Sequence, residues 1–555
     1  MDSTLIARLG DLTAFLAAQG VAAWLVGGAA RDLARGQAPS DLDVAVAGDG
    51  YALARVYADT CGAAFVPLDQ ERATGRVVIP GEPPLTLDLT ALRGPTIEAD
   101  LRLRDFTVNA LALPLTPGSS AISGQPSVVS RQWSVVSGQP SVVSGQWSAV
   151  SGQPSVVSGQ WSAVSGQWSA VSGQWSAVSG QWSAVIDPTG GLADLRAGRL
   201  RACGPTSLRD DPLRVLRAAR LCATLGLRPD PELTPLMREA APSLDSIAAE
   251  RTRDELLKLL DAPVSAPWLR YLDDCGALTR LIPELEPARA CPQPKVHFLP
   301  VLAHILETVA ALDWLIGGAM GQPAPDELPV AVQTHPDLRR TLPFAEQMTT
   351  LLNERRAGGH RRAALLKLAA LLHDNAKPQT KVVHPDGKVS FYDHQMLGAE
   401  VAAHIARRLR LSRQDGGYVA LVVREHMRPG QLRASEVLTL RALVRLFNDL
   451  GDAGPDVLLH ELADHLAARG PNLNVAGWTE HLAWVETLLA HYYRPRPARQ
   501  TPLIDGHGLM AALGLGPGPL VGELLREIGE AQAVGEVQTL EEALALVRQR
   551  VQARG

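Results

Sequence analysis

Two carboxylates separated by one residue stand at the start of an apolar stretch. Asp41 and Asp43 flank a leucine in "DLDVAVA". In a β-strand, residues i and i+2 point to the same face, so the two carboxylates would lie side by side. Such close like charges raise each other's pKa unless a cation lies between them, and carboxylate oxygens are the ligands that Mg²⁺ prefers. The spacing therefore predicts a strand that binds Mg²⁺, with Asp41 and Asp43 as catalytic residues.

A phosphate-binding turn is expected just before this strand. In "WLVGGAARDLARG", Gly27 and Gly28 follow an apolar strand, and Arg31 lies one helical turn later. Glycines at a strand-to-helix turn let backbone N–H groups approach phosphate oxygens, and arginine binds phosphates well. Asp88 in "LTLDLTAL" is a candidate third carboxylate on a neighbouring strand. Alone, each feature also fits a tight turn or a solvated strand edge, but their order together favours a nucleoside triphosphate site.

Composition indicates an ordinary globular protein with several domains. The chain has 555 residues, is 46% hydrophobic and carries a formal net charge of −5, which argues against a generally basic nucleic-acid binder. The five cysteines form no CxxC pair, and the N-terminus lacks the pattern of a signal peptide. No uninterrupted apolar run reaches the length of a membrane span. We therefore expect a cytoplasmic protein without a membrane partner, whereas the sequence leaves the oligomeric state open.

The hydrophobic patterns predict an interrupted first domain followed by helical ones. A seven-residue repeat, "SGQWSAV", fills much of the insert, where Ser and Gly occupy the positions that a coiled coil needs apolar. We expect this insert to be disordered, with a small β-stack as the alternative. The expected segments are 1–116 and 187–204 (α/β head), 117–186 (insert), 205–290 (helical neck), 291–490 (histidine-bearing helical domain) and 491–555 (helical RNA-binding tail).

Four stretches in the head and neck resemble a known family. "LVGGAARDLARGQAPSDLDVAV", "LRLRDFTVNALAL", "DPTGGLADLRAGRLR" and "LRDDPLRVLRAARLCATLGL" are similar to successive motifs of class II tRNA nucleotidyltransferases and bacterial poly(A) polymerases. This resemblance implies an α+β, polymerase β-like nucleotidyltransferase head with a mixed sheet and helices, followed by all-helical parts. It also implies a set of nucleotide-binding residues, namely Gly27, Gly28, Arg31, Arg104, Asp105 and Asn109.

The stretch "DDPLR" resembles the family's nucleotide-selecting motif, with Asp210 in place of the usual glutamate. We expect Asp211 and Arg214 to share one helical face, which Arg217 continues. A carboxylate accepts from the amino group of cytosine or adenine, and an arginine donates to the neighbouring ring nitrogen. The pair would therefore select CTP and ATP, although an ordinary surface ion pair has the same spacing.

The second half carries histidines and aspartates on separate predicted helical stretches, namely His304, His373, Asp374 and Asp464. Together with "HDNAKP", they resemble the residue pattern and the HDxxKP signature of the HD phosphohydrolase superfamily. Imidazole and carboxylate ligands suit Mn²⁺, Ni²⁺, Fe²⁺ or Mg²⁺. His394 and His426 are candidate additional ligands. A vestigial HD fold used only for RNA docking is the alternative.

The sequence therefore predicts an enzyme that adds C and A to the 3′ end of tRNA from CTP and ATP. Only about ten residues separate "LTLDLTALR" from "LRLRDFTVN", and such a short segment resembles family members that add only CC. A poly(A) polymerase is the first alternative, since the motifs separate the two activities poorly. A metal-dependent phosphohydrolase or phosphodiesterase acting through the HD domain is the second.

Overall fold

The computed structural model describes most of the chain in two compact units. The described residues are 3–81, 84–115, 185–434, 438–494 and 501–554. The insert predicted at 117–186 therefore lies almost entirely outside the described residues. The sheet unit comprises Met1–Arg214 and Leu227–Leu236, and the helical unit comprises Val215–Gly226 and Met237–Gly555.

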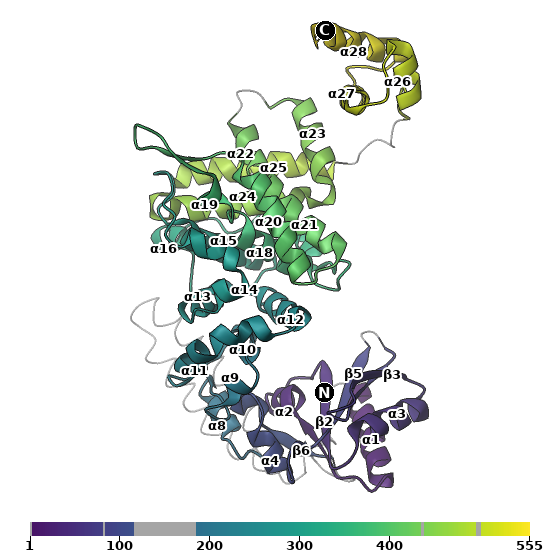
Figure 1. The fold of residues 1–555 in the computed structure, drawn as a ribbon, viewed down its shortest axis with the longest axis vertical. Coiled ribbons are helices and arrows are strands. Elements are labelled where there is room, and N and C mark those ends of the chain that lie inside the picture. The colour runs from purple at the N-terminus through teal and green to yellow at the C-terminus, as the bar shows by residue number, and fades with distance from the viewer. Residues whose placement is uncertain (1–2, 82–83, 116–184, 435–437, 495–500, 555) are drawn as a thin grey trace, which may run out of the picture. The chain divides into compact units, whose positions relative to one another are not determined.

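A six-stranded mixed sheet with the order β3-β4-β5-β2-β1-β6 forms the base of the sheet unit (Figure 1). Its strands are β1 (Ala23–Val26), β2 (Asp41–Val46), β3 (Ala64–Asp69), β4 (Thr74–Ile79), β5 (Leu85–Ala91) and β6 (Ala112–Pro114). Strands β2 and β5 run parallel, and the other neighbours in the sheet run antiparallel. This mixed sheet with helices confirms the predicted α+β head.

Short helices and a 3₁₀ turn connect the strands of this unit. The helices are α1 (Ser3–Ala18), α2 (Gly27–Ala34), α3 (Gly50–Cys61), α4 (Ile97–Arg102), α8 (Gly191–Arg196) and α9 (Ser207–Asp210), and the 3₁₀ turn is η1 (Thr107–Asn109). A second, small parallel pair is formed by β7 (Arg199–Leu200) and β8 (Arg228–Pro229). Ile186, the last residue of the predicted insert, exchanges two backbone hydrogen bonds with Ala112 of β6, so the chain on both sides of the insert joins one unit.

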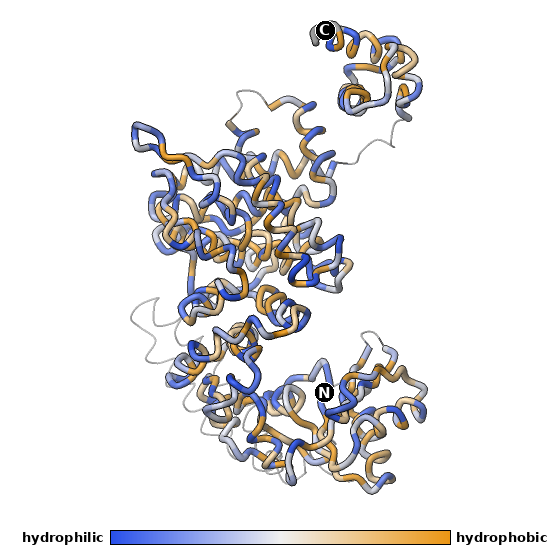
Figure 2. Tube along the Cα trace, in the orientation of Figure 1, coloured by the Kyte–Doolittle hydropathy of each residue, from blue (hydrophilic) through white to orange (hydrophobic). Residues whose placement is uncertain are grey.

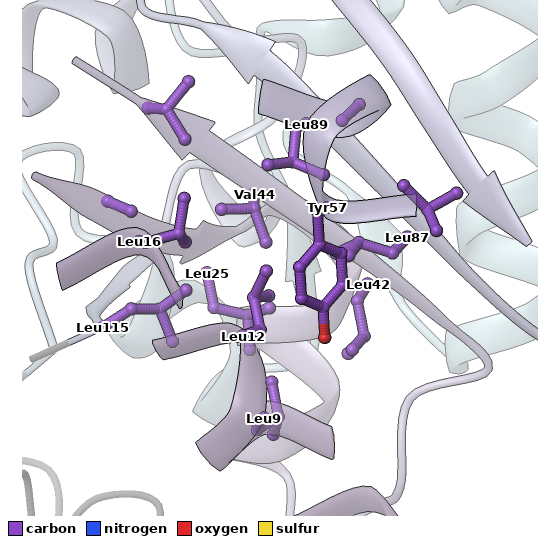
Figure 3. Packing of buried hydrophobic residues seen from close by; sticks show 14 of the residues in the cluster. Leu9, Leu12, Leu16, Leu25, Leu42, Val44, Tyr57, Leu87, Leu89 and Leu115 are labelled. Carbon is purple, nitrogen blue, oxygen red and sulfur yellow. The ribbon is translucent and has the colours of Figure 1, made fainter. Parts of the chain in front are cut away.

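The core of the sheet unit lies between α1 and one face of the sheet. Four leucines of α1, at helical spacing, pack against leucines and valines of β1, β2 and β5. Figure 3 labels Leu9, Leu12 and Leu16 among them, with Tyr57 of α3 beside them. Each fully buried leucine contributes about 1.5–3 kcal/mol of hydrophobic stabilisation. Because α1 and α3 cover this core, the strand ends that carry the polar motifs remain free to form a site.

The helical unit consists of amphipathic and buried helices, whose hydrophilic and hydrophobic residues alternate along the trace in Figure 2. Its N-terminal helices are α10 (Arg214–Leu225), α11 (Leu233–Ala240), α12 (Ala249–Leu260), α13 (Ala266–Asp274) and α14 (Leu278–Leu281), of which α10 and α11 begin in the sheet unit. The central helices are α15 (Val301–Ala319), α16 (Val330–Thr334), α17 (Ala345–Asn353), α18 (Arg362–Leu372), α19 (Lys377–Thr380), α20 (His394–Arg408), α21 (Arg413–Glu425), α22 (Arg428–Arg433), α23 (Leu440–Leu450), α24 (Gly454–Arg469) and α25 (Val475–Tyr493). A hairpin and three last helices complete it: β9 (Lys381–Val383), β10 (Val389–Phe391), α26 (Gly506–Leu513), α27 (Pro519–Ala533) and α28 (Leu540–Arg554).

Helix α15 meets the length and composition of a membrane span, and it is the one described helix that does so. However, 89% of its most apolar 18-residue window is buried inside the protein, as in the core helix of a globular domain. A buried ion pair fixes this helix to α18, because Lys367 Nζ lies 2.7 Å from Asp313 Oδ1. The same carboxylate accepts hydrogen bonds from the backbone N–H groups of Ser265 and Ala266 at the start of α13. These contacts set the relative positions of the two helices that carry or precede His304 and His373.

Candidate functional site

The turn from β1 into α2 brings a helix N-terminus against charged side chains. Gly27 begins α2 with a φ of +66°, a conformation that favours glycine. A Cβ at this position would lie 3.1 Å from Asp43 Oδ2 and 3.3 Å from Arg104 Nη1. The lack of a Cβ therefore leaves room for the side chains of Asp43 and Arg104 beside the start of α2. Gly28 follows inside the helix, as the predicted phosphate-binding turn requires.

Asp41 and Asp43 lie on strand β2, two residues apart, as predicted. Asp41 is exposed and accepts a hydrogen bond from Thr86 Oγ1, whereas Asp43 is half-buried. Burial and the neighbouring Asp88 raise the pKa of Asp43 to about 6. Clustered carboxylates whose charge is poorly compensated suit a divalent cation, so the donor set fits Mg²⁺.

Asp88, the candidate third carboxylate, is held by an arginine that sequence reasoning missed. The register of the sheet pairs Asp88 with Asp43 on one side and with Arg76 of β4 on the other. Arg76 Nε and Nη2 donate to the two oxygens of Asp88 at 2.7 and 2.8 Å. This bidentate pair compensates Asp88 and leaves Asp41 and Asp43 as the better ligands. No sequence motif in β3 or β4 marks Arg76, so only the pairing of β4 with β5 could have identified it.

Arg31 and Asn109 are brought together from positions 78 residues apart. Arg31 Nη1 donates to Asn109 Oδ1 at 2.6 Å, and Arg31 Nε donates to Asp32 at 2.8 Å. Asn109 Nδ2 in turn donates to Asp105 Oδ1 at 3.3 Å. The structure therefore links the predicted phosphate arginine to two of the predicted ribose and phosphate residues.

Arg104 is oriented by a buried carboxylate that the sequence analysis did not single out. Asp100 of α4 is almost fully buried and accepts from Arg104 Nε at 3.0 Å. Its other oxygen accepts from the backbone N–H of Arg93 at 3.1 Å. Asp100 therefore ties together both ends of the short segment between β5 and "LRLRDFTVN". Its position four residues before Arg104 is the signal that could have identified it.

The prediction that Asp211 shares a helix with Arg214 is wrong. Helix α9 ends at Asp210, and Asp211 has extended geometry with φ −146° and ψ 98° before α10 begins at Arg214. The reason is Pro212, because a residue that precedes proline is disfavoured in the α conformation. Asp211 Oδ1 instead accepts from the backbone N–H of Leu213 at 3.2 Å. Asp211 therefore lies in the short link between α9 and α10.

Arg214 and Arg217 do share one helix, α10. Arg214 Nη1 donates to the backbone oxygen of Ser207 at 2.9 Å, which holds its side chain against the preceding helix. Arg217 lies 3.4 Å from Glu255 Oε1 of α12, and Arg220 pairs with the same carboxylate at 2.6 Å. Arg217 is thus anchored to the neighbouring helix of its own unit.

The helical unit gathers six predicted residues into one buried group, here called the histidine cluster: His304, His373, Asp374, His394, His426 and Asp464. His304 Nε2 lies 2.9 Å from Asp464 Oδ1 and 3.5 Å from Asp374 Oδ2. His373 Nε2 lies 3.2 Å from Asp374 Oδ2. The two additional candidates, His394 and His426, approach Asp374 Oδ1 at 3.4 and 3.8 Å.

The orientation of the imidazoles suits metal ligation. Nδ1 of His373, His394 and His426 each donates to the backbone carbonyl three residues earlier, at 2.7–2.9 Å. The lone pair of each ring is therefore on Nε2, which faces the carboxylates. Nε2 of His373 and Oδ1 of Asp374 are buried without a hydrogen-bond partner among the described residues, whereas Oδ2 of Asp374 is paired with Lys377. Burial, followed by the nearby His373, lowers the pKa of His426 to about 3, which keeps it neutral. These orphaned donors fit a divalent metal such as Mn²⁺, Fe²⁺ or Ni²⁺.

Two further residues of this centre were missed. His460 of α24 packs with ring centroids 4.9 Å from His373, and His297 lies 5.0 Å from His304. Lys377, the lysine of "HDNAKP", lies with its Nζ 2.6 Å from Asp374 Oδ2. A cavity of about 790 Å³ opens beside the cluster and is lined in part by His297, Lys377 and Asp464.

Comparison with known proteins identifies the family. The chain is 32% identical over 530 residues to the A-adding tRNA nucleotidyltransferase of Deinococcus radiodurans, and the match covers 94% of each chain. The chain belongs to the tRNA nucleotidyltransferase family. It is also 31% identical to the CC-adding tRNA nucleotidyltransferase of Thermus thermophilus over 95% of this chain and 93% of that one.

Solved structures share the fold of this tRNA nucleotidyltransferase. A CCA-adding enzyme in complex with ATP matches with a TM-score of 0.56 and 19% identity, covering 99% of this chain and 96% of that one. The Thermotoga maritima CCA-adding enzyme in complex with tRNA matches with a TM-score of 0.54 and 18% identity over the same shares.

Three family models match parts of the chain. Residues 226–289 match a probable RNA and SrmB-binding site of polymerase A, and residues 339–468 match the HD domain. Residues 115–186 match a grass antifreeze beta roll, and this match falls on the seven-residue repeat. A beta roll is a β-structure, like the β-stack that was the alternative to disorder. Nearly all of the matched residues lie outside the described part of the chain.

Proposed function

We propose that the sheet unit adds cytidine to the 3′ end of tRNA from CTP, building the CC part of the CCA end. The observation that carries this specificity is the short segment between β5 and "LRLRDFTVN", which Asp100 ties at both ends. A segment tied in this way resists the rearrangement that a change of base from C to A would need. Relatives along the whole chain are named for one part of the CCA end, either CC or A, which supports a restricted enzyme.

The chain's own residues bind and orient the nucleotide. The backbone N–H groups of Gly27 and Gly28 at the N-terminus of α2, together with Arg31, would bind the triphosphate. Arg31 is pre-oriented by Asn109, and Arg104 by Asp100. Such fixed cations and dipoles stabilise developing charge without having to reorganise during the reaction.

Asp41 and Asp43 would hold Mg²⁺. Bound there, the ion would supply charge neutralisation of the triphosphate and acidify the attacking 3′-hydroxyl. The carboxylates position this charge at the edge of the sheet where β2 begins, beside the start of α2. The reaction joins the RNA 3′-oxygen to the α-phosphorus, and pyrophosphate leaves.

Asp211 and Arg214 would select the base. Asp211 would accept from the exocyclic amino group of cytosine, and Arg214 would donate to its ring nitrogen. Uracil presents the opposite donor and acceptor order and would leave buried groups unpaired, which is costly. Arg217, anchored on Glu255, would extend the same basic face.

The test uses tRNA transcripts that end at the discriminator base, at C or at CC, incubated with Mg²⁺ and each labelled nucleoside triphosphate. Addition that stops at CC supports the proposal. Addition of a single A to the CC transcript alone would instead make this an A-adding enzyme, as its Deinococcus relative is named. Complete CCA on every transcript would overturn the restriction, and long A tails would indicate a poly(A) polymerase. With tRNA as substrate, the cytoplasm is the expected compartment.

A second candidate activity is hydrolysis of a phosphate ester by the helical unit. The observation that favours it is the histidine cluster, whose orphaned Nε2 and carboxylate atoms face one another beside a cavity. A divalent metal held there would supply an acidified water as nucleophile. Hydrolysis of p-nitrophenyl phosphate by the full chain with Mn²⁺, Ni²⁺ or Mg²⁺, lost in His373→Gln, would support it. Absence of hydrolysis with every metal would favour the docking role.

A further inference from the structure

The cavity beside the histidine cluster has a second group of polar residues. Besides Asp374 and Asp464, it is lined by Arg433 of α22 and Arg469 of α24. Asp464 and Arg469 lie five residues apart on α24, which is about 7.5 Å along a helix axis. The cavity therefore offers cationic groups at a short distance from the cluster.

Arg433 is oriented by a chain of two hydrogen bonds. His481 Nε2 donates to Glu461 Oε2 at 2.5 Å, which leaves the lone pair of the ring on Nδ1. Nδ1 then accepts from Arg433 Nη1. This arrangement fixes the guanidinium while its other N–H groups remain available at the cavity wall.

The two hydrogen bonds of His481 argue against a further metal site. Glu461, His465 and His481 lie close enough together to hold an ion. However, both ring nitrogens of His481 are already used, one as donor to a carboxylate and one as acceptor from an arginine. A cation could bind His481 only by displacing Arg433 or Glu461. Glu461 and His481 therefore serve to position Arg433.

The side chain of Arg469 makes no hydrogen bond or ion pair with the residues that the structure describes. It is half-buried, and burial lowers the pKa of its guanidinium, while the carboxylates of Glu461 and Asp464 oppose that shift and Arg433 adds to it. Arg433 and Arg469 line the same cavity, and Arg433 is held by its hydrogen bond to His481. Guanidinium groups bind phosphate oxygens through their N–H donors, so the two side chains suit an anion in this cavity. Phe391 and Met427 line the same cavity and offer apolar surface to a nucleoside.

We propose that Arg433 and Arg469 form an anion subsite that binds a second phosphate of the substrate, while the histidine cluster binds the phosphate that reacts. The substrate class is then a ribonucleoside that carries two phosphate groups, either free or at the end of an RNA chain. This inference rests on the proposed hydrolytic function. In that reaction a water oxygen forms the new bond to phosphorus, the ester P–O bond breaks, and the leaving oxygen takes a proton to give an alcohol and inorganic phosphate.

The test compares a substrate with one phosphate and a substrate with two. Hydrolysis of p-nitrophenyl phosphate and of adenosine 3′,5′-bisphosphate is measured with the full, metal-loaded chain and with Arg433→Gln, Arg469→Gln and His481→Ala. Arg407→Gln is the matched control, because Arg407 is exposed on α20 outside the cavity. We expect KM for the bisphosphate to rise about tenfold in each cavity variant, as for the loss of one charged contact. The kcat/KM for p-nitrophenyl phosphate stays within about twofold, and Arg407→Gln changes neither.

Two other results would overturn the subsite. One is an equal loss with both substrates, which would mean that the variants damage the cluster or the fold. The other is an unchanged KM for the bisphosphate. A transcript that ends in a 3′-phosphate distinguishes the sources: if it is hydrolysed with a lower KM than the free bisphosphate, and this advantage is lost in Arg469→Gln, the second phosphate is that of an RNA terminus.

A binding measurement distinguishes failure of the hydrolytic function from failure of the anion subsite. If the chain hydrolyses neither ester with any metal, calorimetric binding of adenosine 3′,5′-bisphosphate decides the subsite on its own. One binding site that is lost in Arg469→Gln, and retained in Arg407→Gln, supports the subsite. Equal binding by all variants overturns it. The metal content is measured alongside, and an ion lost in His481→Ala but not in Arg433→Gln would replace the positioning role of His481 with a metal site.

Discussion

The two candidate sites of this chain differ in how exposed their charged groups are and in how those groups are paired. In the sheet unit, Asp41 is exposed, and the cations around the site are already paired with asparagine or carboxylate groups. In the helical unit, five of the six residues of the histidine cluster are buried, and Nε2 of His373, Nε2 of His394 and Oδ1 of Asp374 lack hydrogen-bond partners among the described residues. The first site is open to a mobile Mg²⁺–nucleotide complex, whereas the second suits a resident metal. The two sites should therefore respond differently to substitution, to metal removal and to pH.

The largest expected effect is the separation of the two activities by Asp43→Asn. Nucleotide addition should fall by more than about a hundredfold, the upper range for losing even an outer-shell partner of a metal. Hydrolysis by the helical unit should remain unchanged. Length-resolved addition assays check this, with Asp59→Asn on the exposed face of α3 as the matched control. Parallel loss of both activities would contradict two separate sites.

The reverse variant, His373→Gln, should remove bound metal from the helical unit. We expect metal affinity to fall by at least about 10- to 100-fold, because a ring with a fixed Nε2 lone pair is lost. Addition to tRNA should stay within about twofold. Metal analysis of chelator-treated and reconstituted protein measures the first, and the addition assay measures the second. Retention of the full metal content would show that the cluster does not hold it.

Asp100→Asn sharpens the account of the sheet unit. The amide keeps the shape of Asp100 but removes the charge that pairs with Arg104 and compensates Arg93. We expect a loss of about tenfold in kcat/KM for CTP, the size of one charge-assisted hydrogen bond. If freedom of the segment controls specificity, the variant should also begin to incorporate A after CC. Unchanged kinetics and unchanged specificity would separate the segment from nucleotide choice.

Gly27→Ala tests the close approach at the start of α2. Gly20 is the matched control, since it has nearly the same φ, +68° against +66°, but open space where a Cβ would stand. Both alanines should cost about 1–2 kcal/mol of stability through backbone strain. Only Gly27→Ala should also raise KM for CTP, because its Cβ would press on Asp43 and Arg104. Chemical denaturation and steady-state kinetics provide the two readouts, and equal kinetics for both variants would contradict the close approach.

The smallest expected effect is a pH dependence of stability without divalent cations. The pKa of Asp43 is raised to about 6 in the folded chain, from an ordinary 3.8. The folded state therefore holds this proton more tightly, and stability falls as pH rises from about 4 to about 6. In EDTA, Asp43→Asn should melt about 2–4 °C above the parent chain at pH 7.5, with a smaller difference at pH 5. A difference that is independent of pH would contradict the raised pKa.

Local patterns predicted the parts of both sites that depend on a few neighbouring residues. The strand that carries Asp41 and Asp43 and the strand-to-helix turn at Gly27 and Gly28 were predicted because their spacing and glycines act locally. Asp211 was misplaced because helical periodicity was given more weight than the proline that follows it. That error was avoidable, since the effect of proline on its neighbour is also local.

Contacts between distant segments could not be predicted in the same way. The bidentate ion pair between Arg76 and Asp88 depends on strand register, which "GRVVIP" alone does not specify. The addition of His460 to the cluster depends on how α24 packs against the helix that precedes His373. The six predicted cluster residues were found without packing information because they were taken from the resemblance to HD phosphohydrolases.

One measurement tests the central claim most directly: a crystal structure of the chain with CTP and Mn²⁺, in which anomalous scattering locates the metal. We expect the ion on Asp41 and Asp43, the triphosphate against the N-terminus of α2 and Arg31, and the cytosine edge on Asp211 and Arg214. A nucleotide bound with its base away from Asp211 and Arg214, or metal found only in the histidine cluster, would contradict the account.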